Sequence, residues 1–260
     1  MTFDENSLKV NAKDPADPNS VRAKVDLPDR MVVTTKSYGD VTLYLRPRFY
    51  LDGTPRVRNV MLRISGGADS ALLLYMLAIF KRDYNPNIRI FLSTSINPTK
   101  PYQYIFADAV IKKVKELTGV EFEEHMWKEC DGSSAERYRE SQGEFINEIV
   151  PYNKIEILFN GETMNPTADF LPLMTGTRDE TRDGPSTKNG AVTFARNAYP
   201  FRNFNKKAIA ELYEHFGLTE TLFPITRSCE KLTTNPADFA AHCDACWFCE
   251  ERKWGFGRLI

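Results

Sequence analysis

The feature that most constrains the fold is an alternation of strand-like and helix-like segments that begins at Val57. In chain order the segments read "VRNVMLRI", "SALLLYMLAIFKR", "NIRIFLSTSI" and "PYQYIFADAVIKKVKELTG". The runs "EFEEHMW", "SSAERYRESQGEFINEIVP" and "KIEILFNGE" continue the same pattern. Such alternation is typical of a parallel sheet that is covered by helices on both faces. We therefore expect an α/β fold with a doubly wound, mostly parallel sheet.

Several of the expected helices carry end signals in the sequence. Gly119 lies where a left-handed stop would end the helix that follows the second strand. Ser133 and Glu136 have the spacing of a capping box at the start of the next helix. Asn205 and Gly217 bracket the run "NKKAIAELYEHFG" as cap and stop. These signals support helices rather than long loops between the strands.

Composition and pattern divide the chain into three parts. Residues 1–56 hold a polar arm and a predicted β-hairpin around Gly39, which together form an N-terminal extension. Residues 57–225 form the α/β domain, and residues 226–260 form a C-terminal subdomain rich in cysteine. Within the α/β domain, residues 162–200 are expected to be mostly loop, and a loop of that length is usually functional or disordered.

Charge and hydropathy exclude several classes of protein. The chain of 260 residues has a formal net charge of -1, which gives no general attraction to nucleic acid or an anionic membrane. Its longest apolar run, around Ala71 to Phe80, is far shorter than the roughly 20 residues that span a bilayer. The polar start has no signal-peptide pattern. We expect a cytoplasmic protein whose partners are recognised by local sites.

The stretch "SGGADS" at residues 65–70 lies where the first strand of the alternation becomes a helix. Gly66 and Gly67 allow the backbone to turn tightly and approach an anion, while Ser65 and Ser70 add hydroxyl donors. Ligands of doubly wound sheets bind at this edge, where helix amides point outward. The structural alternative is an ordinary turn in which Ser65 or Asp69 caps the helix.

The six residues resemble the S-G-G-x-D-S signature of the PP-loop ATP pyrophosphatases, whose fold is of the adenine nucleotide alpha hydrolase-like type. That family binds ATP, expels pyrophosphate and transfers AMP to an oxygen of the substrate. The resemblance implies that ATP and Mg²⁺ are cofactors and that Asp69 acts in catalysis by holding the cation. It also implies a nucleotide-binding segment, which consists of Ser65, Gly66, Gly67, Ala68, Asp69 and Ser70.

Four of the five cysteines lie close together in the C-terminal subdomain. Cys243, Cys246 and Cys249 have C-x-x-C-x-x-C spacing, and Cys229 lies upstream. Four thiolates at about 2.3 Å from one ion complete the tetrahedral shell of a structural zinc site. An iron–sulfur cluster is the main alternative, since cysteine thiolates hold those too. His242 could replace one ligand, although a solvated loop histidine is the simpler interpretation.

The two motifs together resemble the 7-cyano-7-deazaguanine synthase family. After the phosphate loop, "TRSC", "CDACWFC" and "ERKWGF" follow in the order of that family's T-x-S-C, C-x-x-C-x-x-C and E-R-x-x-A-F segments. The resemblance implies an enzyme that adenylates the carboxylate of 7-carboxy-7-deazaguanine and accepts ammonia to give an amide. A second activation of the amide then leaves the nitrile. Homodimers are common among similar enzymes.

The resemblance also assigns residues. It implies Zn²⁺ at the four cysteines, and it matches a family lysine with Lys206 or Lys207, either of which could neutralise phosphate charge in the transition state. A surface lysine at a helix start is the structural alternative. The family's short acidic segment after "FNGE" is replaced by a long loop here, which leaves another carboxylate or amide open as the substrate.

Other charged residues have two interpretations each. Arg178, Asp179 and Arg182 in the long loop are candidates for substrate recognition, against a flexible charged loop. Arg252 and Lys253 could face phosphate, although a solvated helix face is the default.

Rival functions remain open at this stage. They are a tRNA sulfur-transfer enzyme, an amidotransferase-like ligase on a different carboxylate, a sulfate-nucleotide reductase and an ATP sensor without turnover. The sulfur-transfer hypothesis predicts a basic RNA-binding surface or module, and this near-neutral chain has no obvious one.

Overall fold

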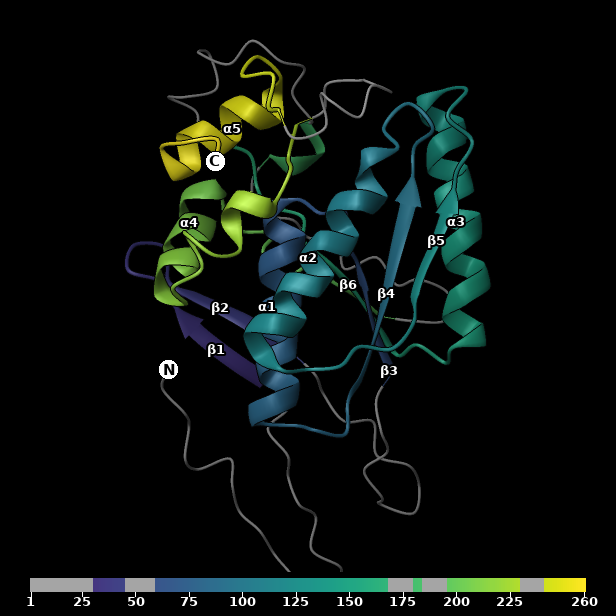
Figure 1. Cartoon of the computed structure of the whole chain (residues 1–260), viewed down its shortest axis with the longest axis horizontal. Helices are drawn as coiled ribbons and strands as arrows, with labels where there is room; N and C mark the ends of the chain where they lie inside the picture. Colours follow the sequence, from purple (N-terminus) through teal and green to yellow (C-terminus); the bar gives the residue numbers. More distant parts are fainter. Residues whose placement is uncertain (1–29, 45–58, 168–179, 184–195, 230–240) are drawn as a thin grey trace, which may run out of the picture.

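The computed structural model describes residues 30–44, 59–167, 180–183, 196–229 and 241–260. These residues contain a two-stranded hairpin and a five-stranded sheet with helices on both sides. Figure 1 shows the sheet with its covering helices and the C-terminal helix at one end. The polar arm expected over the first residues of the chain lies outside the described ranges.

The five-stranded sheet is parallel throughout and has the strand order β5-β4-β3-β6-β7. Its strands are β3 (Asn59–Arg63), β4 (Arg89–Ile96), β5 (His125–Glu129), β6 (Ile157–Asn160) and β7 (Arg196–Ala198). From β3 at the centre the chain passes outward through β4 to β5, and then crosses to β6 and β7 on the opposite side. This order confirms the doubly wound α/β fold and puts a ligand-binding switch point between β3 and β6.

The helices cover the two faces of the sheet unequally. They are α1 (Ala68–Asp83), α2 (Tyr102–Thr118), α3 (Ala135–Tyr152), α4 (Lys206–His215) and α5 (Trp247–Phe256). Because side chains alternate along a strand, Leu62 of β3 faces the large cluster with α1 and α2, whereas Met61 faces α3. Helices α1 and α2 contact each other, and α4 contacts α5 (Figure 1).

The predicted N-terminal hairpin is confirmed, with β1 (Arg30–Thr34) and β2 (Asp40–Tyr44) paired antiparallel. Gly39 forms the turn with a positive φ of +80°, and its carbonyl accepts the Thr35 N–H at 3.0 Å. Val33 belongs to the same hydrophobic cluster as α1. The hairpin therefore shares the main core of the α/β domain.

Two predicted helix starts have different outcomes. Asn205 caps α4 as predicted, because its side chain accepts the main-chain N–H groups of Lys207 and Ala208. For α3 the predicted capping box at Ser133 is wrong, since Ser134 is the cap and accepts the N–H of Arg137 at 3.1 Å. The main chain at Ser133 is instead held by an Asp131 side chain.

The expected loop over 162–200 contains more structure than predicted. Strand β7 and a short 3-10 turn at Glu180–Arg182 both lie within it. Residues 168–179 and 184–195 are outside the described ranges, so the prediction for Arg178 and Asp179 falls outside them too. In the described parts of the chain, no helix combines the length and apolar character that a membrane crossing requires.

Candidate active site and metal centre

The predicted phosphate loop joins β3 to α1 at the carboxyl edge of the sheet, beside the switch point. Gly66 has φ +78°, and a Cβ at this position would lie 2.5 Å from the Phe106 Cβ, so a larger residue does not fit. Gly67 is the N-cap of α1, and no side chain caps this end of the helix. The alternative of a helix capped by Ser65 or Asp69 is therefore not observed, and the amides can receive an anion.

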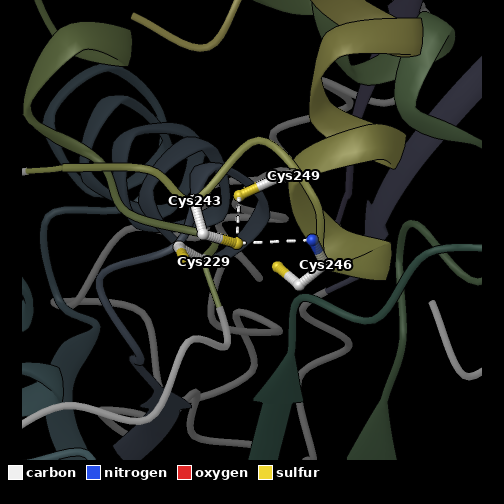
Figure 2. Close-up of side chains that lie close together, drawn as sticks. All are labelled: Cys229, Cys243, Cys246 and Cys249. Carbon is white, nitrogen blue, oxygen red and sulfur yellow. Dashed lines mark hydrogen bonds between the residues drawn. The ribbon is translucent and has the colours of Figure 1, made fainter. Parts of the chain in front are cut away.

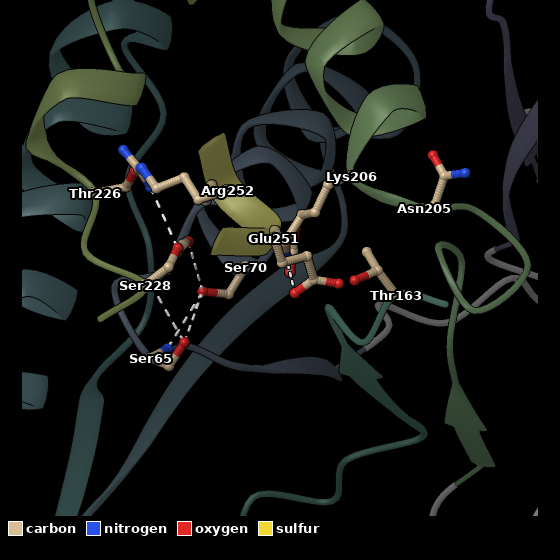
Figure 3. Close-up of polar contacts among 12 residues, drawn as sticks. Ser65, Ser70, Thr163, Asn205, Lys206, Thr226, Ser228, Glu251 and Arg252 are labelled. Carbon is tan, nitrogen blue, oxygen red and sulfur yellow. Dashed lines mark hydrogen bonds and ion pairs between the residues drawn. The ribbon is translucent and has the colours of Figure 1, made fainter. Parts of the chain in front are cut away.

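The two serines hold the loop in shape. The hydroxyl of Ser70 accepts the Ser65 N–H at 3.3 Å and donates to the Gly67 carbonyl at 3.1 Å. The Ser65 hydroxyl accepts the Gly67 N–H at 3.3 Å (Figure 3). These short local bonds fix the backbone before any ligand binds.

Lys206 brings a positive charge to the start of α1. Its Nζ forms an ion pair with Asp69 Oδ2 and lies 4.0 Å from Glu251 Oε2, although only 4% of its side chain is exposed. Figure 3 shows Lys206 and Glu251 close together on different helices. The second oxygen of Asp69 and Oε2 of Glu251 are buried without a hydrogen-bond partner in the described structure. Two such carboxylate oxygens suit a hard cation such as Mg²⁺.

Glu251 extends the charged network to Arg182. The two side chains form an ion pair and are almost fully buried, at 0% and 6% exposure. Arg182 Nε also donates at 2.7 Å to the carbonyl of Thr163, three residues after the end of β6. The guanidinium of Arg182 is thus engaged by protein groups, and it orders the segment after β6 as well as lining the pocket.

The two candidate lysines are separated by the fold. Lys206 lines the pocket beside Asp69, whereas Lys207 is exposed and places its Nζ 4.8 Å from the ring centre of Trp254. Adjacent residues of a helix point about 100° apart, so one lysine at most could face the phosphate loop. Of the two, Lys206 is the lysine that lies at the phosphate loop.

Asp69, Arg182 and Lys206 line a pocket of about 320 Å³. Its wall combines the phosphate loop, the start of α2, the segment after β6, the start of α4 and Cys229. The volume lies within the range of small-molecule sites, and the charged side chains converge on it.

Arg227 connects the phosphate loop to the cysteines. Its main-chain N–H donates to the Gly66 carbonyl at 2.9 Å, two residues before Cys229. Its guanidinium stacks on Tyr102, 4.6 Å from the ring centre, and the Tyr102 hydroxyl donates to the Cys229 carbonyl at 3.0 Å. The two sequence motifs are therefore adjacent in space.

The four cysteines converge as predicted (Figure 2). The Sγ atoms of Cys229, Cys243, Cys246 and Cys249 all lie within 4.8 Å of one another. Cys243 and Cys249 have a separation of 3.9 Å between their Sγ atoms. Tetrahedral coordination at about 2.3 Å would place sulfur atoms about 3.8 Å apart. The four thiols can hold a metal.

Proximity changes the titration of these thiols. A hydrogen bond with Cys229 raises the pKa of Cys246 to about 11, and contacts with Cys229 and Cys246 also raise the pKa of Cys249. Metal binding to such thiols releases protons. His242 does not belong to the group, and burial lowers its pKa to about 4. It is half-buried, so the solvated-loop interpretation of His242 is wrong.

No family model matches this sequence, and no curated protein matches it either. Among solved structures, the chain is similar to the U34-tRNA thiolase NcsA from Methanococcus maripaludis, determined with its [4Fe-4S] cluster. The identity is 16% and the TM-score 0.47, with 74% of this chain and 66% of that chain covered. The match thus spans slightly less than two thirds of the thiolase.

The solvated-face interpretation of α5 is wrong for Arg252 and right for Lys253. Arg252 is fully buried; its guanidinium donates to the Thr226 hydroxyl at 2.8 Å and lies 3.8 Å from the Phe223 ring centre. Burial lowers its pKa to about 10. Lys253 is 57% exposed and pairs with Asp244. Arg252 therefore fastens α5 to the segment that carries Cys229 (Figure 3).

Sequence reasoning did not find Glu251. It lies four residues after the buried Trp247, on the inward side of α5, and that spacing was the available signal. A buried acid at such a position needs a cationic partner, but its partners come from α4 and from the turn at Glu180–Arg182.

Proposed function

We propose that the chain is an ATP-dependent adenylating ligase similar to 7-cyano-7-deazaguanine synthase. In this proposal it converts 7-carboxy-7-deazaguanine and ammonia to the nitrile, with activation by AMP transfer. The observation that carries the proposal is the position of Lys206 and Asp69 at the uncapped start of α1, within one pocket.

The chemistry has two activations. A carboxylate oxygen of the acceptor attacks the α-phosphorus of ATP, the bond to the α–β bridging oxygen breaks, and pyrophosphate leaves. Ammonia then displaces AMP to give the amide and a proton. The amide oxygen attacks the α-phosphorus of a second ATP and a second pyrophosphate leaves. Loss of AMP and of both amide protons then leaves the nitrile.

The residues of the pocket suit these steps. The amides at the start of α1 and the ammonium of Lys206 would hold the β- and γ-phosphates and stabilise the departing pyrophosphate. Asp69 and Glu251 would hold Mg²⁺, which supplies charge neutralisation at the phosphates when it is bound. Lys206 is fixed between the two acids, so it needs little reorganisation during the reaction.

We also propose that the four cysteines bind Zn²⁺ as a structural ion. Sulfur separations within 4.8 Å are close to the spacing that one tetrahedral ion requires. Four protein ligands leave no open position, which favours a structural role over sulfur transfer. Metal analysis tests this directly: one zinc per chain supports it, and iron with acid-labile sulfide contradicts it.

The functional test is incubation of the purified protein with ATP, Mg²⁺, ammonium and 7-carboxy-7-deazaguanine. We expect AMP, pyrophosphate and a product that has gained one nitrogen and lost both carboxyl oxygens, by mass spectrometry. Omission of ammonium should stop the reaction at the adenylate. AMP formation with another carboxylate alone would keep the ligase class and reject this substrate.

A further inference from the structure

A second pocket, of about 300 Å³, adjoins the active-site pocket at the carboxyl edge of the sheet. Arg63 of β3, Ser93 of β4, Asn160 of β6 and Tyr138 of α3 line it. Arg63 lies on the same face of β3 as Met61, which packs against α3. The second pocket is therefore on the α3 face of the sheet, next to the end of β3 that leads into the phosphate loop.

The two pockets share part of their walls. Ser65, Gln103 and Glu162 line both of them. Ser65 is the first residue of the phosphate loop, so a ligand of the second pocket would meet a nucleotide held at that loop.

Arg63 places a positive charge without an ion-pair partner among the described residues in the second pocket. Among the described residues, no carboxylate lies within 4.0 Å of its guanidinium and no hydrogen bond engages it. Glu162, the acid in this wall, forms its ion pair with Arg202 instead. Burial lowers the pKa of Arg63, but a guanidinium remains protonated in proteins. Its five N–H donors are arranged to match a carboxylate.

Other polar groups of the wall are also available. Ser93 is 2% exposed, and its hydroxyl has no hydrogen-bond partner in the described structure. The Asn160 side chain makes one long bond, at 3.4 Å, to the Leu158 carbonyl. A buried hydroxyl without a hydrogen-bond partner destabilises the folded protein unless a ligand or a water molecule supplies the missing hydrogen bond.

We propose that the second pocket binds the acceptor of the adenylation reaction and that Arg63 anchors its carboxylate. The inference rests on the proposed function and names the place of its second substrate. In the proposed function the loop and Lys206 bind the phosphates of ATP, so Arg63 is available to bind the carboxylate of the acceptor. A carboxylate and a triphosphate repel each other, and a guanidinium between them offsets that repulsion as the carboxylate oxygen approaches the α-phosphorus.

The test is equilibrium binding by calorimetry, with 7-carboxy-7-deazaguanine and its uncharged amide as probes, in the presence of Mg²⁺ and α,β-methylene ATP. The variants are Arg63→Gln and Arg63→Lys. The matched control is Arg89→Gln, since Arg89 is exposed, begins β4 at the opposite edge of the sheet and pairs with Glu123. Circular dichroism checks that each variant is folded.

We expect Arg63→Gln to weaken binding of the acid by about 10- to 100-fold, with little change for the amide or for α,β-methylene ATP. Arg63→Lys should recover part of the loss, and Arg89→Gln should bind as the unmodified protein does. The inference is overturned if the unmodified protein does not bind the acid, if Arg63→Gln binds it normally, or if that variant loses the nucleotide instead. Acid binding through Arg63 without pyrophosphate release would contradict the proposed function alone.

Discussion

The phosphate loop and the cysteine cluster line the same pocket, but they are held together in different ways. The loop is a run of six residues that is fixed by the positive φ of Gly66 and by short bonds from Ser65 and Ser70. The cluster joins side chains from two separate segments, and its thiols raise one another's pKa. The comparison indicates that bonds within the loop fix its shape, whereas in our proposal a bound ion would stabilise the cluster.

The largest expected effect is on catalysis at the loop. Asp69→Asn should lower the rate of pyrophosphate release by about 100- to 1,000-fold, because it removes the acid that pairs with Lys206 and would hold Mg²⁺. Glu251 still faces Lys206, so the fold should be retained. A coupled pyrophosphate assay and a melting curve measure the two effects. A variant that loses stability but keeps its rate of pyrophosphate release would contradict a catalytic role for Asp69.

The next effect is on stability at the cluster. Cys246→Ser should release the metal and lower the unfolding free energy by about 3 kcal/mol, or roughly 6–12 °C in melting temperature. Cys130→Ser is the control, since Cys130 is buried outside the cluster and should leave the metal content unchanged. Metal analysis and calorimetry provide the measurements. Equal metal content in the two variants would contradict metal binding by the four-cysteine cluster.

A substitution in the loop backbone tests whether the fold alone shapes it. Gly66→Ala should cost about 1–3 kcal/mol of stability and abolish nucleotide binding, because the new Cβ would contact Phe106 and the φ is positive. Gly143→Ala is the matched control: nothing lies within 4 Å of its Cβ, and it is inside α3. The control should gain up to about 1 kcal/mol. Denaturant unfolding and nucleotide titration compare the two variants. A Gly66→Ala protein that binds ATP normally would contradict the claim that the backbone of this loop forms the nucleotide site.

The smallest expected effect is at the surface of α5. Lys253→Ala removes an exposed ion pair with Asp244 and should change stability by less than about 1 kcal/mol, without loss of metal or activity. Arg252→Lys, one residue away, should cost more, since its buried guanidinium bonds three protein oxygens at 3.0 Å or less. Melting curves measure the stability of both variants. Equal losses of stability would mean that the buried contacts of Arg252 do not stabilise the protein.

Local motifs of the sequence predicted much of the fold and part of the site. The alternation from Val57 predicted the parallel sheet, and the cysteine spacing predicted the cluster, because contiguous residues carry both signals. The three-residue strand β7 was missed, since its length leaves no period to detect. The shift of the α3 cap from Ser133 to Ser134 depends on one residue of loop geometry.

The missed side chains are those whose partners come from distant segments. Glu251 meets Arg182 and Lys206 only because α5 packs on α4 beside the segment after β6. Arg63 ends an apolar strand, and no neighbouring residue in the sequence indicates that its side chain lacks an ion-pair partner. Charge in a buried position becomes informative only when the tertiary contacts are known.

The central claim is that the loop at residues 65–70 binds the triphosphate of ATP for cleavage between the α- and β-phosphorus atoms. The most direct measurement is a crystal structure with α,β-methylene ATP and Mg²⁺. We predict the β- and γ-phosphates at the amides that begin α1, beside Lys206, with the α-phosphate toward the second pocket. Phosphates bound elsewhere, or an empty loop at saturating nucleotide, would contradict the account.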